Sequence, residues 1–286
     1  MDERAALALI GGSLPTAGDD AAVVDDLVVT TDMLHETTDF PDGTTRRTAG
    51  WRAVGASLSD VAAMGADARC AVAVYAAPRF EEADLRAFLD GAREVCETVG
   101  AEYVGGDLDD HEEFTVATTA IGRTDDPVPR SGATPGEAVC VTGTLGRSAA
   151  AVRLFPEAPD RANDLFRFEP RVAAGRALAA HAGAMMDSSD GLARSLHQLA
   201  EASDCGFAVD AETLPVDVAV DDVAADAADR RELAVHYGED FELVFTTDDP
   251  AAARAASPTP VTVLGEVTES GVEMDGEPLA DRGYTH

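Results

Sequence analysis

Lysine is absent from this chain: all 21 of its Lys and Arg residues are arginine, against 54 acidic residues, which gives a formal net charge of −33 over 286 residues. This absence excludes several ways of handling phosphates and cofactors. A P-loop and a protein kinase each place a lysine beside the phosphates of the nucleotide, and a pyridoxal phosphate enzyme forms a Schiff base with one. Nucleic acids and anionic membranes are bound through basic patches, so we expect neither as a partner.

Cysteine is scarce, and long apolar runs are missing. Cys70, Cys96, Cys140 and Cys205 are far apart and have no C-x-x-C spacing, so we expect buried free thiols rather than a zinc site or disulfides. No apolar run approaches the length of a membrane span, and we expect no signal peptide. With 45% hydrophobic residues the chain has enough apolar side chains for a core. Its acidity is typical of halophiles, and we expect a cytoplasmic protein adapted to high salt.

Helical and strand periodicities alternate in the first half of the chain. Apolar positions at helical spacing predict helices over 47–65 and 81–99. Short apolar runs predict strands over 70–76, 101–104 and 113–121. This mixture is typical of an α/β or α+β domain with a mixed sheet and covering helices.

A segment rich in proline and glycine, residues 122–137, is the best candidate for a domain boundary. We therefore predict an N-terminal domain over 1–128 and a C-terminal α/β domain over 129–286. A second alternation of helices and strands follows the boundary. It predicts a strand at 138–142, helices at 147–154 and 170–181, a strand at 183–186, a helix at 190–202, strands near 206–210 and 241–247, and a terminal β region at 261–279.

Aspartate recurs in one setting, in short clusters of acidic and small residues at the ends of apolar runs. Carboxylates that converge from the ends of several elements are the ligands that Mg²⁺ requires, and Mg²⁺ is commonly bound together with phosphate. In so acidic a chain an isolated aspartate means little, so the setting of each cluster decides its interpretation. The five clusters are Gly18-Asp19-Asp20-Ala21, Thr30-Thr31-Asp32, Ser59-Asp60, Gly105-Gly106-Asp107 and Asp187-Ser188-Ser189-Asp190-Gly191.

The first two clusters are the arms of a β-hairpin predicted over residues 21–31. A symmetric hairpin pairs Val24 with Leu27 and, further out, Asp19 with Asp32. Opposed side chains lie about 5 Å apart, and like charges at that distance destabilise the pair. A divalent cation, with hydroxyl ligands from the two threonines that precede Asp32, would offset this repulsion. The alternative is that these acids are solvated residues at the end of a loop.

The other clusters each have a functional and a structural interpretation. Asp60 lies in a helix of small and apolar residues, which favours a bound partner, although the acid could also lie on an exposed helix face. Gly105-Gly106-Asp107 follows a strand, where an aspartate suits a metal or a ribose, but two glycines also make a tight turn. In the last cluster Ser189 or Asp190 could be the N-cap of a helix, which accounts for one of its two acids.

Few basic residues lie near these clusters in the sequence and could bind a phosphate. The segment Gly143 to Gly146 lies between a predicted strand and a predicted helix but lacks the first glycine of a dinucleotide-binding fingerprint. Arg130 and Arg147 flank this region and could neutralise phosphate oxygens. The alternative is that both arginines are solvated.

Taken together, the clusters resemble the thiamine-monophosphate kinase family, in the superfamily that also holds aminoimidazole ribonucleotide synthetase and selenophosphate synthetase. The similarity spans nearly the whole chain in the order of the family. The matching segments are GDDAAV (18–23), TTDMLHETTDF (30–40), SLSDVAAMGA (57–66), GGD (105–107), RSGATPGEAVCVTGTLG (130–146), DSSDGL (187–192), ASDCG (202–206) and YGEDFELVFT (237–246).

The resemblance implies a two-domain α/β enzyme whose N-terminal sheet pairs in a homodimer. It implies that ATP is the co-substrate and that several Mg²⁺ ions are bound. The implied nucleotide contacts are Gly106, Asp107, Arg130 and Ser189. The implied metal ligands are Asp20, Thr30, Thr31, Asp32, Asp60, Asp107, Asp187 and Asp190.

The implied reaction joins the γ-phosphoryl group of ATP to the phosphate of thiamine monophosphate, with Glu239 and Tyr284 contacting the thiamine moiety. Bacterial relatives have a histidine where this chain has Asp39, the third implied substrate contact. The absence of a catalytic lysine agrees with this reaction. A phosphate acceptor has a second pKa of about 6, so it is already ionised and needs no general base.

Two other functions are compatible with the same residues. A sibling ATP-dependent enzyme would keep the nucleotide site but act on another small phosphate or amide, so that Glu239 and Tyr284 would have other roles. A non-catalytic, salt-adapted protein would use its acidic clusters only to bind water and cations.

Overall fold

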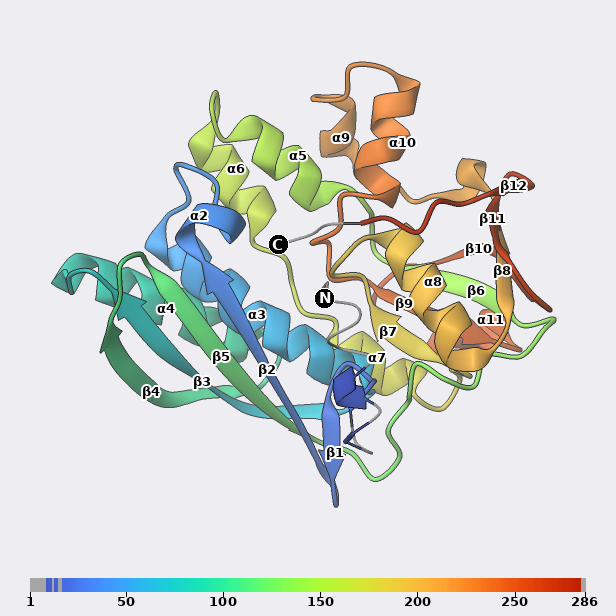
Figure 1. Cartoon of the computed structure of the whole chain (residues 1–286), viewed down its shortest axis with the longest axis horizontal. Coiled ribbons are helices and arrows are strands. Elements are labelled where there is room, and N and C mark those ends of the chain that lie inside the picture. Colours follow the sequence, from blue (N-terminus) through green and yellow to red (C-terminus); the bar gives the residue numbers. More distant parts are fainter. Residues whose placement is uncertain (1–8, 12, 15–16, 284–286) are drawn as a thin grey trace.

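Two β-sheets organise the part of the chain that the computed structural model describes, residues 9–11, 13–14 and 17–283. The first sheet belongs to the N-terminal half, and helices cover one of its faces (Figure 1). In spatial order its strands are β1 (Ala22–Val24), β2 (Leu27–His35), β5 (Thr115–Arg123), β3 (Asp67–Ala77) and β4 (Glu102–Asp110). Its helices are α2 (Glu36–Asp39), α3 (Arg46–Ala63) and α4 (Glu82–Thr98).

Helix α3 is the central element, because it lies between the first sheet and the second domain (Figure 1). Thr45 caps it by accepting a hydrogen bond from the backbone N of Thr48. Its small residues let α4 approach closely: a Cβ at Gly50 would lie 2.2 Å from the carbonyl oxygen of Phe88. Most of the helix is buried, whereas Asp60 in its last turns is half-buried.

The second sheet belongs to the C-terminal half and mixes parallel and antiparallel pairs. In spatial order its strands are β12 (Glu277–Pro278), β11 (Val272–Met274), β8 (Gly206–Val209), β10 (Val261–Thr268), β6 (Ala138–Thr142), β9 (Leu243–Thr247) and β7 (Met185–Asp187). The helices around it are α5 (Arg147–Leu154), α6 (Pro159–Phe166), α7 (Val172–Leu178), α8 (Leu192–Ser203), α9 (Val218–Asp221), α10 (Ala227–Val235) and α11 (Pro250–Ala256), with a 3₁₀ turn η1 at Ala211–Thr213.

The predicted fold class is confirmed: each half combines a mixed sheet with helices. The strand predicted over 101–104 is too short, because β4 continues to Asp110 and contains both glycines of the third cluster. The alternative of a tight Gly-Gly turn is therefore wrong. Helices α2, α6 and α11 were not predicted. None of the helices in the described part of the chain is long and apolar enough to cross a membrane.

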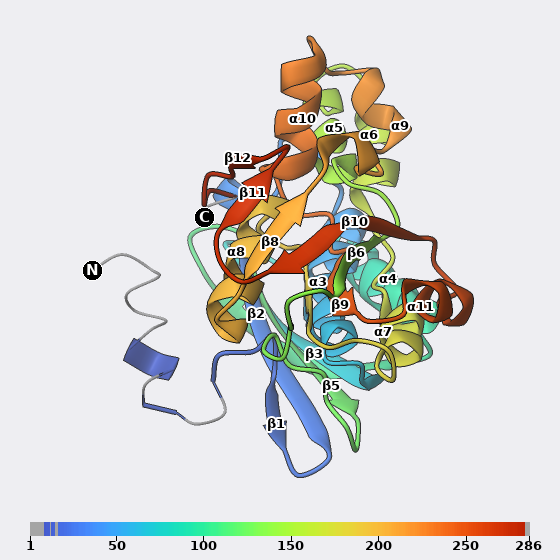
Figure 2. The same ribbon diagram turned by 90° about the vertical axis from the view of Figure 1, so that its right-hand side faces the viewer.

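The predicted hairpin forms, but only its inner pairs are correct. Val24 pairs with Leu27, and the ladder between β1 and β2 ends where Ala22 pairs with Val29. On its other edge β2 pairs with β5 over its whole length, from Leu27 to His35 (Figure 2). In that ladder Asp32 lies opposite Thr118. The predicted opposition of Asp19 and Asp32 in one ladder is therefore wrong, because the pairing of β1 with β2 does not extend beyond Ala22 and Val29.

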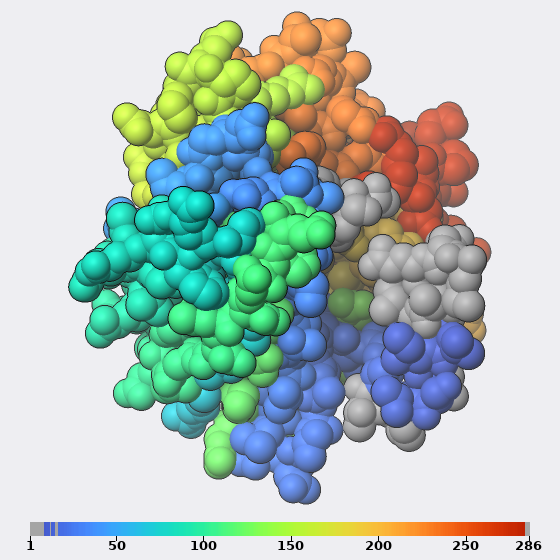
Figure 3. Space-filling view, turned by 60° about the vertical axis from the view of Figure 1, so that its left-hand side comes forward, coloured from blue at the N-terminus to red at the C-terminus, as the bar shows by residue number. Residues whose placement is uncertain are grey.

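The face of the first sheet opposite α3 and α4 carries exposed apolar side chains. Met33 is 54% exposed and Val74 is 39% exposed. By register, Met33, Ala117, Val74 and Asp107 form one row across β2, β5, β3 and β4. In the space-filling view the blue to green segments of this domain lie open at the surface, with the yellow to red segments beside them (Figure 3).

Candidate active site

Three carboxylates from three different elements meet at one point. Asp20 precedes β1, Asp60 lies in the last turns of α3, and Asp187 is the final residue of β7. One ligand oxygen from each lies within 4.8 Å of the others, and this is the one such group of potential metal ligands among the described residues. The sequence clusters thus converge where the two domains meet.

The electrostatics of this group favour a bound cation. Burial, together with the nearby charge of Asp20, raises the pKa of Asp187 to about 7. Burial and the charges of Asp187 and Asp20 raise the pKa of Asp60 well above its usual range. Two hydroxyls oppose these shifts: Ser59 Oγ donates to Asp187 Oδ2 at 2.5 Å, and Thr30 Oγ1 donates to Asp60 Oδ2 at 2.5 Å. A divalent cation would relieve the repulsion, and oxygen ligands of this kind suit Mg²⁺.

A cavity of about 200 Å³ opens beside the three carboxylates. We call it the metal-side cavity. It contains most of the predicted metal ligands and one predicted nucleotide contact, together with a guanidinium and an aromatic ring. Its lining residues are Asp20, Thr30, Thr31, Asp32, Leu34, Arg52, Ala56, Asp60, Ser189, Asp190, Glu239 and Phe241.

Arg130, a predicted nucleotide contact, binds two of the acids. Its Nε and Nη2 donate to the two carboxylate oxygens of Asp20 at 3.1 and 2.9 Å, and its backbone N donates to Asp19 Oδ1 at 2.7 Å. The pair with Asp20 is bidentate, the stronger geometry for arginine and carboxylate. Asp19 is therefore held by the backbone of the segment between the domains, without any need for a cation.

The cluster of residues 187–191 is not a side-chain helix cap. The N-cap of α8 is Gly191, with a φ of +102°, and no side-chain hydrogen bond caps that end of the helix. The predicted alternative, in which Ser189 or Asp190 is the N-cap, is wrong. Both side chains line the metal-side cavity instead.

The segment from Gly238 to Glu242 is bound directly to this cluster. The backbone N of Glu239 donates to the carbonyl of Ser189 at 2.6 Å, and that of Phe241 donates to the carbonyl of Ser188 at 3.1 Å. Glu239 and Phe241 have φ values of +63° and +54°. Non-glycine residues in this region are strained, and such strain is concentrated at functional sites.

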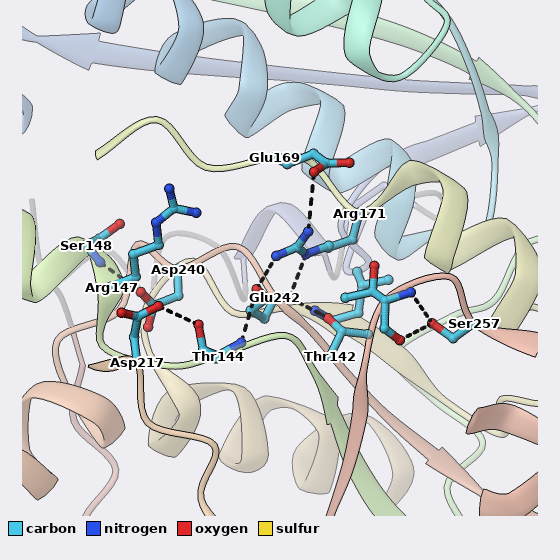
Figure 4. A network of polar contacts seen from close by, with 12 residues as sticks. Thr142, Thr144, Arg147, Ser148, Glu169, Arg171, Asp217, Asp240, Glu242 and Ser257 are labelled. Atoms are coloured by element: carbon cyan, nitrogen blue, oxygen red, sulfur yellow. Dashed lines mark hydrogen bonds and ion pairs between the residues drawn. The ribbon is translucent and has the colours of Figure 1, made fainter. Parts of the chain in front are cut away.

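A buried polar network holds this strained segment in place (Figure 4). Asp240 accepts from the backbone N of Gly146 at 2.5 Å and of Ser148 at 3.0 Å, and burial raises the pKa of Asp240 to about 7. Arg171 donates to both oxygens of Glu242 at 2.6 and 2.8 Å. The turn that ends at Gly146 therefore binds protein carboxylates, and not a phosphate.

Arg147 has a structural role. Its Nη2 donates to the carbonyl oxygens of Asp164 and Arg167 at 3.4 Å, so it lies at the C-terminal end of α6 and not in the metal-side cavity.

A second cavity, of about 250 Å³, adjoins the first at Glu239. We call it the aromatic cavity. Asp39 lines it and accepts from the backbone N of His35 and from Thr38 Oγ1, both at 2.7 Å. Two of the three predicted substrate contacts thus face one cavity, and the third, Tyr284, lies outside the described residues. The lining residues are Thr37, Thr38, Asp39, Phe40, Pro41, Val152, Phe166, Tyr237 and Glu239.

Four of the predicted residues that the structure describes line neither cavity. Asp187 and Arg130 still lie beside Asp20, whereas the other two lie elsewhere. Gly106 and Asp107 lie in the exposed edge strand β4, and the row that contains Asp107 reaches β2 at Met33. Three strand spacings separate β4 from β2, a distance of about 14 Å. Asp107 therefore cannot share a metal ion with Asp32 of its own chain, whose side chain lines the metal-side cavity.

One residue of the site was missed by the sequence analysis. Arg52 is buried in α3, lines the metal-side cavity and forms an ion pair with Glu239. A cation among small and apolar helix residues is the same signal that singled out Asp60, and it could have been used for Arg52 as well.

Comparisons with known proteins agree with this geometry. Residues 18–124 match the family model described as AIR synthase related protein, N-terminal domain, and residues 134–275 match that of the C-terminal domain. A thiamine-monophosphate kinase of Halobacterium salinarum is 64% identical over the full length of both chains. One of Methanospirillum hungatei is 40% identical over 100% of this chain and 99% of its own.

Solved structures give the same result. The structure titled AaThiL complexed with AMPPCP and TMP has a TM-score of 0.90 at 29% identity, covering 99% of this chain and 96% of its own. A thiamine-monophosphate kinase of Stenotrophomonas maltophilia has a TM-score of 0.82 at 32% identity, covering 91% and 90%. The fold and the acidic site thus define a two-domain protein of the AIR synthase related class. Within that class, the chain is an enzyme that belongs to the thiamine-monophosphate kinase family.

Proposed function

We propose that this enzyme transfers the γ-phosphoryl group of ATP directly, in line, to the phosphate of thiamine monophosphate, which yields thiamine diphosphate and ADP. The observation that carries the proposal is the meeting of Asp20, Asp60 and Asp187 beside a cavity that adjoins a second, aromatic one. This choice of substrates is supported by the relatives named thiamine-monophosphate kinases and by the structure of AaThiL complexed with AMPPCP and TMP.

The donor set fits several Mg²⁺ ions, because all of it is carboxylate and hydroxyl oxygen. When bound, these ions would screen the repulsion between the two substrates and polarise the transferred phosphoryl group. The residues of this chain that would hold them are Asp20, Thr30, Thr31, Asp32, Asp60, Asp187 and Asp190, with Asp107 supplied as described below.

The side chains of the site have to position and desolvate the substrates, and not to move a proton. Neither lysine nor histidine lines either cavity among the described residues. This agrees with an acceptor phosphate that is already ionised near neutral pH, since its second pKa is about 6. Ser189 and Arg130 would contact the nucleotide. Asp39, Glu239 and Tyr284 would contact the thiamine moiety.

We also propose that the enzyme is a homodimer in which Gly106 and Asp107 of one copy complete the site of the other. Asp107 lies in the exposed row with Met33 and Val74, too far from Asp32 to act in its own chain. A second copy packed on this open face would bury the apolar side chains and bring its β4 to the metal-side cavity. The proposed domains, 1–128 and 129–286, leave this face entirely in the first domain.

The test is an assay of the purified chain in concentrated KCl. We expect ADP release that requires Mg²⁺ and thiamine monophosphate, with thiamine diphosphate as the product detected by ³¹P NMR, and no ADP release with thiamine. Asp187→Asn should abolish turnover, whereas Asp90→Asn, at an exposed acid in α4, should leave it unchanged. Turnover with a different small phosphate, and none with thiamine monophosphate, would contradict the proposal.

A further inference from the structure

Arg52 stands where the two cavities adjoin. It lines the metal-side cavity, and its Nη2 donates to Oε2 of Glu239, which lines both cavities. Arg52 is the only arginine that lines either cavity among the described residues. A positive and a negative side chain are thus held side by side on the boundary between the metal-binding residues and the aromatic cavity.

The guanidinium is fixed in position from several sides. It stacks on the ring of Phe166 with 3.6 Å from Cζ to the centroid, and its Nη1 donates to the carbonyl of Phe166 at 2.6 Å and to Ser148 Oγ at 3.3 Å. Arg52 is only 2% exposed. A planar group held in this way is already oriented before any ligand arrives, so little rotamer entropy remains to be lost on binding.

Two of its donors remain for a ligand. A guanidinium has five N–H groups, and the structure engages three of them, two on Nη1 and one on Nη2. The N–H of Nε and the second N–H of Nη2 have no hydrogen-bond partner among the described residues. Nε and Nη2 lie on the same edge of the guanidinium, the edge that forms paired hydrogen bonds with two oxygens of one phosphate or carboxylate.

We infer that Arg52 binds the acceptor phosphate and thereby makes the enzyme select thiamine monophosphate over thiamine. This inference rests on the proposed function. Thiamine monophosphate carries a cationic thiazolium ring and an anionic phosphate. These charges are complementary to the Arg52–Glu239 pair, because the phosphate can pair with Arg52 and the ring with Glu239. The phosphate must lie on the metal side, where transfer occurs, and Arg52 lines that side. Glu239 also faces the aromatic cavity, where the cationic ring is attracted.

A purely structural role is the competing explanation. Arg52 links α3 of the first domain to Ser148, Phe166 and Glu239 of the second, so its loss could simply loosen the contact between the domains. The two explanations differ in one measurable quantity. A structural role weakens the binding of thiamine and of thiamine monophosphate alike, whereas a phosphate-binding role weakens only the phosphorylated ligand.

The test measures the dissociation constants of both ligands by calorimetry, with AMPPCP and Mg²⁺ present. For Arg52→Gln we expect the preference for thiamine monophosphate over thiamine to fall at least tenfold, and the affinity for AMPPCP to stay within twofold of wild type. Arg52→Lys should lose less of the preference, because it keeps the charge but not the paired donors. Arg147→Gln, at an arginine outside both cavities, is the matched control and should behave as wild type.

An equal loss of affinity for both ligands, or an unchanged preference, would overturn the inference. If Arg52→Gln does not fold, NMR of the wild-type protein decides, with the Arg52 Nε–H signal assigned by its loss in Arg52→Lys. That signal should shift with thiamine monophosphate and not with thiamine, and equal shifts would refute the inference. Failure of the proposed function is distinguishable, because wild-type enzyme would then release no ADP with thiamine monophosphate.

Discussion

Ser59 donates its hydroxyl to Oδ2 of Asp187 at 2.5 Å, which joins α3 of the first domain to the end of β7 in the second. This hydrogen bond lowers the pKa of a buried carboxyl that would otherwise hold its proton still more tightly. We expect Ser59→Ala to weaken Mg²⁺ binding by about 1–3 kcal/mol, the usual cost of removing a hydrogen bond from a charged group. Mg²⁺ titration of AMPPCP binding measures the effect.

The matched control for Ser59→Ala is Ser57→Ala, two residues earlier on the same buried helix. Ser57 Oγ bonds with the hydroxyl of Thr118, not with a carboxylate. Ser57→Ala should lower the stability of the protein without changing the Mg²⁺ dependence of AMPPCP binding. Equal Mg²⁺ dependence in both variants would mean that Ser59 does not act on the metal-binding carboxylate.

Metal affinity should depend on pH. Burial and Asp20 raise the pKa of Asp187 to about 7, and the pKa of Asp60 is raised as well. A carboxylate must lose its proton before it binds Mg²⁺, so affinity should increase as the pH rises towards 7 and level off above the raised pKa values. Mg²⁺ titrations of AMPPCP binding at a series of pH values test this. In Asp187→Asn the dependence should become shallower, because one titrating group is gone.

In the metal-free protein the same pKa shifts make the free energy of unfolding fall as the pH rises, whereas Mg²⁺ affinity increases. A carboxyl whose pKa is raised by folding binds its proton more tightly in the native state than in the unfolded state. Its contribution to the free energy of unfolding is therefore favourable in acid and falls between pH 4 and about pH 7. Denaturant unfolding with EDTA present should be less sensitive to pH over this range in Asp187→Asn than in wild type. If the free energy of unfolding changed equally with pH in both proteins, the raised pKa of Asp187 would be contradicted.

The sequence pattern identified the acids of the site better than it identified their partners. Asp20, Asp60 and Asp187 were singled out by their settings, and they converge. The argument from the hairpin failed for Asp19, because the ladder between β1 and β2 ends at Ala22 and Val29. Asp19 lies outside it and is bound by the backbone of Arg130, 111 residues away in the sequence. A tight turn was one of two interpretations of Gly105 and Gly106, yet both lie in an edge strand that pairs with β3.

The basic residues of the site were harder to assign for a related reason. Arg130 and Arg147 were both considered for phosphate, and only Arg130 was predicted to contact the nucleotide. In the structure Arg130 binds Asp20, whereas Arg147 binds carbonyl groups at the end of α6. Arg52 was overlooked, because its carboxylate partner, Glu239, is 187 residues away in the sequence. Helices, caps and short turns follow from local chemistry, whereas the partner of a buried charge is set by the packing of distant segments.

The buried pair of Arg171 and Glu242 should support the stability of the protein. Both oxygens of Glu242 accept from Arg171, and Thr142 Oγ1 donates to one of them at 2.6 Å (Figure 4). Arg171→Met would leave the carboxylate buried without its cation and should lower the free energy of unfolding by about 3–5 kcal/mol. Arg171→Met combined with Glu242→Gln should recover part of this loss. Guanidinium unfolding gives both values, and additive losses would show that the residues are not coupled.

Complementation between two inactive variants tests whether Asp107 acts in the site of a second copy. Asp107→Asn and Asp187→Asn should each abolish activity alone. If Asp107 of one copy serves the Asp187 of the other, a mixed dimer of the two variants contains one intact site and one doubly altered site. Mixing after partial unfolding should then restore up to a quarter of wild-type activity: about half of the dimers are mixed, and each has one working site. Action within one chain would leave every site defective, and no activity would return.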